Sequence, residues 1–265
     1  MNLTFCPPLV ALVTGMEHSC TTYLSQIITL HPRVNAGFEC GLLLADQPAR
    51  FSDIRPFYDW MIGAPDGQWR ISPEDMQEVC RATSWLEAYR RIVRYSPLFS
   101  GQVDLLVDKT PAYIRQLTAV MEKVPGVPVV VATKHILLQY HSYKKRGWEL
   151  DNFAALYVQA QQSLQEAQRK YCGRILVVSH GELVRKRWDQ LRRICHFVGL
   201  NVPHRRRFKS RLAHSNRHYF TRPTGHPPYR YAEQLSRAEA NIDPAERRVL
   251  ETLPDMAVCD EKRAA

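Results

Sequence analysis

Residues 9–22 read L-V-A-L-V-T-G-M-E-H-S-C-T-T, and this stretch decides how the rest of the chain is interpreted. Its first six residues form a nearly continuous apolar run, which is typical of a buried strand in a parallel sheet. Gly15 follows the run, and the hydroxyl residues Ser19, Thr21 and Thr22 lead into an apolar helical pattern. A strand that passes through such a loop into a helix offers backbone N–H groups and the positive helix end to an anion. The stretch therefore predicts an anion-binding loop.

This loop departs from the pattern of nucleoside triphosphatases, which is G-x-x-x-x-G-K-[ST]. Cys20 stands in place of the second glycine, and Thr21 stands in place of the lysine. Without that lysine, the pattern gives little support to a kinase or an ATPase. An ordinary strand, turn and capped helix with no ligand remains an alternative for the loop taken alone.

Outward from the loop, short apolar runs alternate with helical patterns. We expect strands at 9–14, 105–107, 127–132 and 175–178. We expect helices at 21–30, 83–95, 152–171 and 184–198, the last of them ending at Gly199. Strands that alternate with helices predict an α/β fold with a doubly wound, mainly parallel sheet flanked by helices.

The length of 265 residues suits one domain over residues 1–265. Residues 45–75 contain four prolines and are expected to form an excursion between core elements. Residues 201–232 are rich in proline, arginine and histidine and are expected to form a lid or an ordered loop. Variable loops of this kind usually build the substrate side of an α/β site.

The composition of 45% hydrophobic and 23% charged residues is ordinary for a soluble globular protein. No apolar run reaches about 18 residues, so we expect no membrane span and no membrane partner. The seven cysteines are scattered and form no C-x-x-C pair, which argues against a disulfide framework or a zinc site. Reduced thiols and the lack of a recognisable signal peptide lead us to expect a cytoplasmic protein.

The chain has 36 basic and 26 acidic residues, a formal net charge of +10 that favours anionic ligands. The densest basic cluster lies at 205–211, but it lacks the patterns of the common nucleic-acid-binding modules. A solvated basic face is the alternative interpretation of this cluster. We expect no nucleic-acid partner, although nucleic-acid binding is the function class that the charge alone would suggest.

Two further cations follow expected strands. Lys109 follows the strand at 105–107 after Asp108, and Lys134 follows the strand at 127–132. Ser142 comes eight residues after Lys134, on an expected helix. Because open α/β sheets bind ligands at the carboxyl ends of their strands, these residues are candidates for holding a second anionic group.

The order of these motifs resembles the sulfotransferases that use 3′-phosphoadenosine 5′-phosphosulfate. The first loop of that family reads like G-x-P-R-S-G-T-T and corresponds to residues 15–22. Four later motifs have counterparts in the same order: His31-Pro32 with Gly37-Phe38-Glu39, Lys109-Thr110-Pro111, Lys134 with Ser142, and residues 177–200. Each motif alone has little specificity, but five in the same order make a moderately strong resemblance over residues 9–200.

The resemblance implies a role for each matching residue. The donor 5′ end would bind at the first loop, and its 3′-phosphate at Lys134 and Ser142. Glu39 would be the general base, Lys109 would neutralise the sulfuryl oxygens or orient the acceptor, and His18, if protonated, would supply positive charge at the bridging oxygen. No metal is implied, and the product would be adenosine 3′,5′-bisphosphate. The loop residues assigned to the donor are Gly15, His18, Ser19, Cys20, Thr21 and Thr22.

Four positions depart from the family pattern. His18 and Lys134 replace arginines, Cys20 replaces a glycine, and Gly181 replaces an acidic residue. Lysine binds phosphate as a point charge without a bidentate fork, so we expect looser recognition at Lys134. A cysteine at position 20 is costly unless the local φ is negative.

We therefore expect a sulfotransferase that acts on a hydroxyl of a small metabolite or natural product. The alternative is a pseudoenzyme of the same fold that binds the adenosine nucleotide without turnover. Calorimetry with adenosine 3′,5′-bisphosphate would separate these two interpretations from nucleic-acid binding, and turnover of the donor would separate them from each other.

Overall fold

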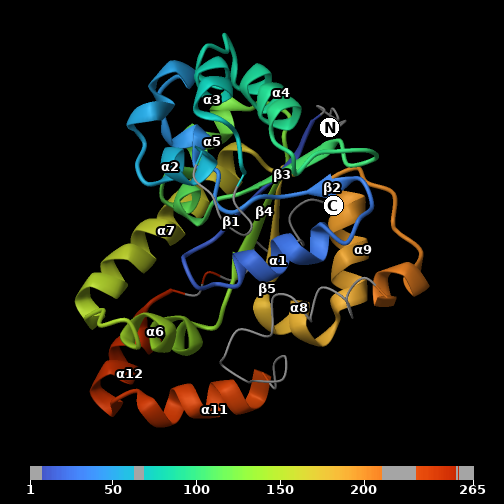
Figure 1. Cartoon of the computed structure of the whole chain (residues 1–265). Helices are drawn as coiled ribbons and strands as arrows, with labels where there is room; N and C mark the ends of the chain where they lie inside the picture. The colour runs from blue at the N-terminus through green and yellow to red at the C-terminus, as the bar shows by residue number, and fades with distance from the viewer. Residues whose placement is uncertain (1–7, 63–68, 211–230, 255, 257–265) are drawn as a thin grey trace.

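The computed structural model describes residues 8–62, 69–210, 231–254 and 256. Its centre is a five-stranded sheet with the order β2-β3-β1-β4-β5, in which each pair of neighbours is parallel (Figure 1). This arrangement confirms the expected parallel α/β architecture. The strands are β1 (Leu9–Thr14), β2 (Val34–Asn35), β3 (Leu105–Lys109), β4 (Val129–Thr133) and β5 (Ile175–Ser179).

The four strands expected from apolar runs are present, and one further strand was not expected. Strand β2 has only two residues, Val34 and Asn35, which pair with Leu105 and Leu106 at the edge of the sheet. Two residues are too few to produce a recognisable apolar run. This strand depends on its pairing with β3 rather than on a local preference.

Helices cover both faces of the sheet, which confirms the doubly wound arrangement (Figure 1). On one face, Val10 and Val13 of β1 share a core with α1 (Thr21–Ile28), α8 (His180–Arg185) and α9 (Arg187–Phe197). On the other face, Leu9 and Leu12 of β1 share a core with a second set of helices. These are α3 (Pro73–Cys80), α4 (Trp85–Tyr95), α5 (Leu117–Lys123), α6 (Ile136–Lys144) and α7 (Leu150–Lys170).

The single helix expected at 184–198 was wrong, because two helices occupy residues 180–197. Lys186 between them has φ −125° and ψ 46°, which is not helical. The break changes the chain direction after α8 and lets α9 pack against α1. The expected end at Gly199 is confirmed, since Gly199 has φ 73° and Leu200 N–H donates to the Cys195 carbonyl at 2.8 Å.

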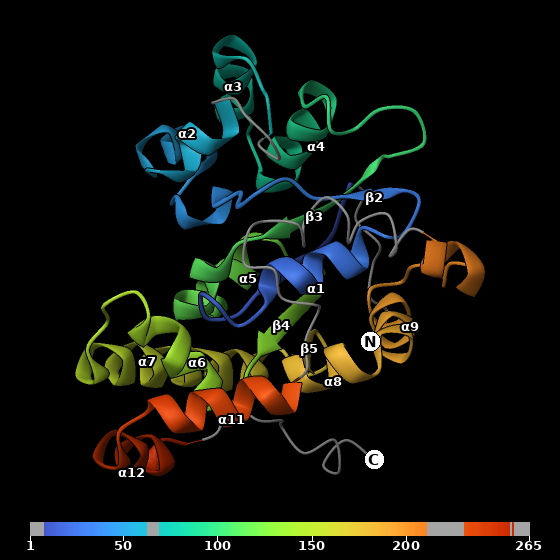
Figure 2. The same cartoon turned by 60° about the horizontal axis from the view of Figure 1, so that its bottom comes forward.

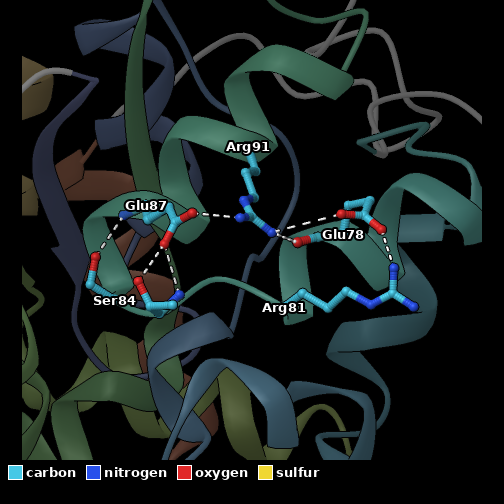
Figure 3. Close-up of polar contacts among 6 residues, drawn as sticks. Glu78, Arg81, Ser84, Glu87 and Arg91 are labelled. Atoms are coloured by element: carbon cyan, nitrogen blue, oxygen red, sulfur yellow. Dashed lines mark hydrogen bonds and ion pairs between the residues drawn. The ribbon is translucent and has the colours of Figure 1, made fainter.

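Polar contacts join α3 to α4, and Figure 3 shows them. Arg91 of α4 donates to the Glu87 carboxylate and to the backbone carbonyl of Glu78. The N–H and hydroxyl of Thr83 donate to Glu87, and these hydrogen bonds, with a smaller contribution from Arg91, lower the pKa of Glu87 to about 2. With Ser84 as the N-cap, these contacts fix the start of α4, which carries Tyr89 toward the site.

The order of the strands reverses beside β1. From β1 the chain crosses to β2 and β3 on one side, and it then crosses to β4 and β5 on the other. Ligands of open α/β sheets bind at such a reversal, outside the carboxyl ends of the strands. The hydrogen bond from the Thr110 N–H to the Val13 carbonyl, 3.0 Å, holds the ends of β3 and β1 together at this point.

The segment 45–75 forms the 3₁₀ helix η2 (Pro48–Asp53) and the short helix α2 (Phe57–Ile62), and its residues 63–68 lie outside the described part. Most of the expected lid at 201–232 also lies outside it. Helices α11 (Tyr231–Asn241) and α12 (Pro244–Thr252) lie beside α6, at the end of the molecule opposite to α3 and α4 (Figure 2). Among the described residues, no helix is long and apolar enough to cross a membrane.

Candidate active site

The loop between β1 and α1 contains three residues with positive φ, two of them at positions that depart from the family sequence pattern. Gly15 has φ 144°, and both His18 and Cys20 have left-handed φ values, 67° and 75°. A cysteine at position 20 would be tolerated without cost only if its φ were negative. The observed φ of Cys20 is positive, so this condition is not met. A non-glycine residue in this region costs on the order of 1–3 kcal/mol, and such strain is typical of binding loops.

Three features of the loop fit an anionic group. A Cβ at Gly15 would lie 2.3 Å from the Ala132 carbonyl oxygen and 2.7 Å from Ser19 Oγ, so only glycine fits. Ser19 is 2% exposed, and its hydroxyl has no hydrogen-bond partner within the described part of the chain. No side chain there caps α1, whose first residues are Thr21 and Thr22. The N–H groups of Thr21 and Thr22, which lie in the first turn of α1 where a helix supplies no partner, and the buried Ser19 hydroxyl are donors that a phosphate would satisfy.

Lys134 lies beside the same loop. Its ammonium group donates to the Ser142 hydroxyl at 3.0 Å and to the His18 carbonyl at 3.2 Å. The lysine directly after β4 and the serine eight residues later on α6 are therefore in contact. Burial lowers the pKa of Lys134, and an anionic ligand beside the ammonium group would oppose this shift.

A second pair of ionisable groups lies at the carboxyl end of β3. Lys109 is 2% exposed, and its ammonium group lies 3.3 Å from Glu39 Oε1 and 4.5 Å from the centre of the Phe38 ring. Lys109 pairs in register with Val13, two residues before Gly15. The structure therefore brings Glu39 and Lys109 together, next to the start of the anion-binding loop.

Burial shifts both members of this pair toward their neutral forms. It raises the pKa of Glu39, an effect that the Lys109 cation opposes. It lowers the pKa of Lys109, an effect that the Glu39 carboxylate opposes. A carboxylate whose pKa is raised holds a proton more firmly, which is the property that a general base requires.

Behind the pair lies a buried carboxylate that the sequence analysis did not single out. Asp108 is fully buried and accepts hydrogen bonds from three hydroxyls: Tyr89 at 2.5 Å, Thr110 at 2.7 Å and Tyr113 at 2.7 Å. Burial raises the pKa of Asp108, and these hydroxyls oppose the shift. A charged residue directly after the apolar run 105–107 was the signal available in the sequence.

The same hydroxyls hold the loop that carries Glu39. The Gly41 N–H donates to the Thr110 hydroxyl at 2.9 Å, and the Leu43 N–H donates to the Tyr113 hydroxyl at 3.1 Å. Asp108 therefore connects the strand that carries Lys109 to the loop that carries Glu39. The separation of the two charged groups depends on this buried network.

His18 is half-buried, with its ring edge-on to Tyr143 at 5.3 Å between ring centres. Burial lowers the pKa of His18, with further contributions from the Arg146 and Lys134 cations. In the ligand-free chain His18 is therefore mainly neutral at pH 7. The neighbouring Glu17 carboxylate accepts from the Tyr143 hydroxyl at 3.0 Å and lies 3.6 Å from Arg115.

The other histidines near the site occupy different environments. His180 is buried against the Tyr231 ring, and burial lowers its pKa to about 4, so it is neutral. His135 is exposed before the first residue of α6. The family's acidic position is Gly181, where a Cβ would lie 3.2 Å from the Tyr231 ring. Glycine at this position thus makes room for Tyr231.

The structure also shows the environment of the basic cluster at 205–211 and the arrangement of side chains that could bind a metal ion. In the described part of the basic cluster, Arg205, Arg206, Arg207 and Lys209 are exposed, while Phe208 packs against Trp188. The basic side chains therefore form a solvent-exposed face, and the buried Phe208 attaches this segment to the rest of the protein. No group of three histidine, cysteine, aspartate or glutamate side chains in the described ranges is arranged to hold a metal ion.

Comparisons with known proteins identify the family and the fold. A model of the sulfotransferase family matches residues 10–204, and the chain belongs to that family. The sulfotransferase domain of the olefin synthase of Synechococcus PCC 7002 has the same fold, with a TM-score of 0.56 and 17% identity over 90% of this chain and 96% of that domain.

Two other solved structures are similar at lower scores. The sulfotransferase STF1 of Mycobacterium tuberculosis H37Rv gives a TM-score of 0.49 and 15% identity over 80% of this chain and 72% of that one. Mouse sulfotransferase SULT7A1, complexed with PAP, gives a TM-score of 0.48 and 10% identity over 92% of this chain and 82% of that one. No curated protein matches the sequence significantly.

The buried network predicts a specific loss of stability. Tyr89→Phe removes one of the three hydroxyls that Asp108 accepts, so it should reduce the free energy of unfolding by about 1.5–3 kcal/mol, the range for a hydrogen bond to a charged group. Urea unfolding measures the change. Tyr95→Phe on the same helix is the control, because no hydrogen bond of the Tyr95 hydroxyl is found in the described structure. Equal losses in the two variants would contradict the network.

The Glu39–Lys109 contact predicts the direction of a titration. Lys109→Met removes the cation that opposes the effect of burial, so the pKa of Glu39 should rise above its value in the unmodified chain. NMR of ¹³C-labelled glutamate side chains measures that pKa. Lys170→Met, which removes an exposed partner of Glu122, serves as the control. An unchanged Glu39 titration in Lys109→Met would show that the two groups do not interact.

Proposed function

We propose that this chain transfers a sulfuryl group from 3′-phosphoadenosine 5′-phosphosulfate to a hydroxyl of a small molecule. One observation carries the proposal: two groups suited to anions lie side by side. They are the uncapped loop with the buried Ser19 hydroxyl, and the Lys134–Ser142 pair, whose lysine donates to the loop itself. A donor with separate 5′ and 3′ phosphate groups matches two neighbouring anion sites.

The donor supplies an activated sulfuryl group whose leaving group is already a stable phosphate. The residues at the start of α1 would hold its 5′ end, and Lys134 with Ser142 would hold its 3′-phosphate. The loop residues in this role are Gly15, His18, Ser19, Cys20, Thr21 and Thr22. Electrostatic stabilisation and alignment of the two reactants are the main demands of such a transfer, so a site without metal ligands is sufficient.

Glu39 is the proposed general base. It takes the proton of the acceptor hydroxyl while the acceptor oxygen forms the new bond to sulfur and the bridging oxygen keeps the electron pair of the broken bond. The ammonium of Lys109, 3.3 Å from Glu39, would orient the acceptor oxygen or neutralise the sulfuryl oxygens. Since burial raises the pKa of Glu39, kcat/KM should fall with decreasing pH at a pH above the usual glutamate range.

His18 would carry a positive charge only when the donor is bound. Its pKa is lowered in the ligand-free chain, and a bound dianionic phosphate would raise that pKa and favour the cation. Positive charge at the bridging oxygen would then accompany donor binding. The pseudoenzyme alternative rests on the same departures, His18, Cys20 and Lys134, and requires that nucleotide binding persists without transfer.

The proposal extends to the organisation of the chain and its setting. Residues 1–265 would act as a single domain, with 45–75 and 201–232 on the acceptor side. The acceptor would be a small molecule rather than a nucleic acid or a membrane component, and the reaction would take place in the cytoplasm.

Lys134→Ala should weaken the binding of adenosine 3′,5′-bisphosphate by about 1–3 kcal/mol, the range for a charge-assisted contact. AMP lacks the 3′-phosphate, so its affinity should change little. Isothermal titration calorimetry measures both affinities, and Lys170→Ala removes an exposed lysine as a control. An equal loss for both nucleotides would place the 3′-phosphate elsewhere.

Glu39→Gln should lower turnover by roughly 10²–10⁴-fold, the usual contribution of a general base, and leave donor affinity intact. Transfer of labelled sulfuryl groups to a library of alcohols and phenols measures turnover, and calorimetry measures affinity. Near-normal turnover in the variant would exclude Glu39 as the base. If the unmodified chain binds the nucleotide and transfers to no acceptor, the pseudoenzyme alternative is correct.

A further inference from the structure

A carboxylate lies inside the loop that is proposed to bind an anion. Glu17 comes between Gly15 and the start of α1, directly before His18, and the proposed transfer gives it no role. A negative charge in such a loop repels a phosphate unless neighbouring groups offset it. The presence of Glu17 in this loop therefore requires an explanation from its contacts.

Groups from two other elements hold Glu17. The Tyr143 hydroxyl on α6 donates to the carboxylate at 3.0 Å. The guanidinium of Arg115, on the 3₁₀ helix η3 (Pro111–Gln116), lies 3.6 Å from the same carboxylate. The buried Gln139 side chain, also on α6, donates to the Glu17 backbone carbonyl. Both the side chain and the backbone of Glu17 are thus fixed, although the side chain is 33% exposed.

Tyr143 also holds the ring of His18. The two rings meet edge-on, 5.3 Å apart between their centres. Tyr143 is 2% exposed and packs against Trp148 at 5.1 Å and Phe153 at 5.3 Å. Burial raises the pKa of Tyr143, with a further contribution from the Glu17 carboxylate, so its hydroxyl stays protonated and remains a donor. One fixed side chain therefore contacts both Glu17 and His18.

Two cations face His18 from other parts of the fold. Lys134, directly after β4, donates to the His18 carbonyl at 3.2 Å, and Arg146 follows α6. Burial lowers the pKa of His18, the Arg146 and Lys134 cations lower it further, and the Glu17 carboxylate opposes these effects. An arginine is charged at any accessible pH, whereas a histidine has an ordinary pKa near 6.5. A histidine among these cations therefore needs a nearby carboxylate to become charged near neutral pH.

We propose that Glu17 is a positioning residue for the transfer, which fixes the His18 ring and supplies the negative charge that lets this ring become a cation when the donor binds. Tyr143 and Arg115 hold the carboxylate in place, and the Arg115 charge also limits the repulsion between Glu17 and the donor. This inference rests on the proposed function and deepens it at the donor loop. Because the Glu17 charge favours the protonated ring, removing that charge moves the loss of the His18 proton to lower pH.

NMR of ¹³C-labelled histidine rings tests this directly and needs no turnover. The His18 signal is the one missing from His18→Arg, and it is titrated in the ligand-free chain and again with excess adenosine 3′,5′-bisphosphate. Glu17→Gln keeps the size of the side chain and an oxygen that can accept from Tyr143, but it removes the charge. The pKa of His18 should fall by about 0.5–1 pH unit in this variant. Glu122→Gln, at an exposed ion pair with Lys170, is the matched control and should leave it unchanged.

A double-mutant cycle tests whether Glu17 acts through His18. Burial and, to a smaller degree, Glu17 raise the pKa of Glu39, so kcat is compared at alkaline pH, where Glu39 is ionised. With saturating donor, Glu17→Gln should lower kcat about 3–10-fold, the loss of cation that a fall of 0.5–1 pH unit produces, and the KM of the donor should not rise. In the His18→Arg background, Glu17→Gln should change kcat by less than about 2-fold.

The two experiments separate this inference from the proposed function. If the His18 titration shifts as expected but no acceptor is sulfurylated, the proposed function fails and the control of the His18 charge by Glu17 stands. An unchanged His18 titration in Glu17→Gln, or an equal change in Glu122→Gln, overturns the inference even if transfer is observed. A loss of kcat that is equally large in the His18→Arg background, or a parallel rise in the KM of the donor, also overturns it, because Glu17 would then act on the loop as a whole.

Discussion

A fully buried carboxylate at the end of β3 is the constraint on which the candidate site depends. Burying a charge is costly unless hydrogen bonds compensate for the lost water, so Asp108 requires its donors. Those donors come from α4 and from the segment after β3, and two of them also hold the loop that carries Glu39. Lys109 is the next residue along the strand, and its distance of 3.3 Å from Glu39 follows from this arrangement. The hydroxyl donors are those of Tyr89, Thr110 and Tyr113.

The second half of the site depends on backbone conformation. The loop after β1 keeps left-handed residues at His18 and Cys20, and the Ser19 hydroxyl between them has no hydrogen-bond partner in the described structure. Lys134 approaches the same loop from β4. Because β1 lies between β3 and β4, the anion-binding groups and the Glu39–Lys109 pair meet at one edge of the sheet. The parallel sheet thus places the Glu39–Lys109 pair next to the loop after β1.

The sequence predicted the elements whose signals are local. Continuous apolar runs identified four strands, and the spacing of Lys134 and Ser142 identified a pair that is in contact. Features that depend on tertiary structure were either not predicted or predicted wrongly. Strand β2 forms only by pairing with β3, and the break at Lys186 arises where α9 turns to pack on α1. The contact between Glu17 and Tyr143 joins residues 126 positions apart, in segments with no shared periodicity.

A crystal structure of the chain with adenosine 3′,5′-bisphosphate tests the central claim most directly, namely that the loop and the lysine form one nucleotide site. The account predicts the 5′-phosphate within hydrogen-bond distance of the N–H groups of residues 18–22 and of Ser19 Oγ. It predicts the 3′-phosphate at Lys134 and Ser142, with the Lys109–Glu39 pair facing the 5′ end. A nucleotide bound elsewhere, or one that leaves Ser19 and Lys134 without contact to phosphate, would contradict it.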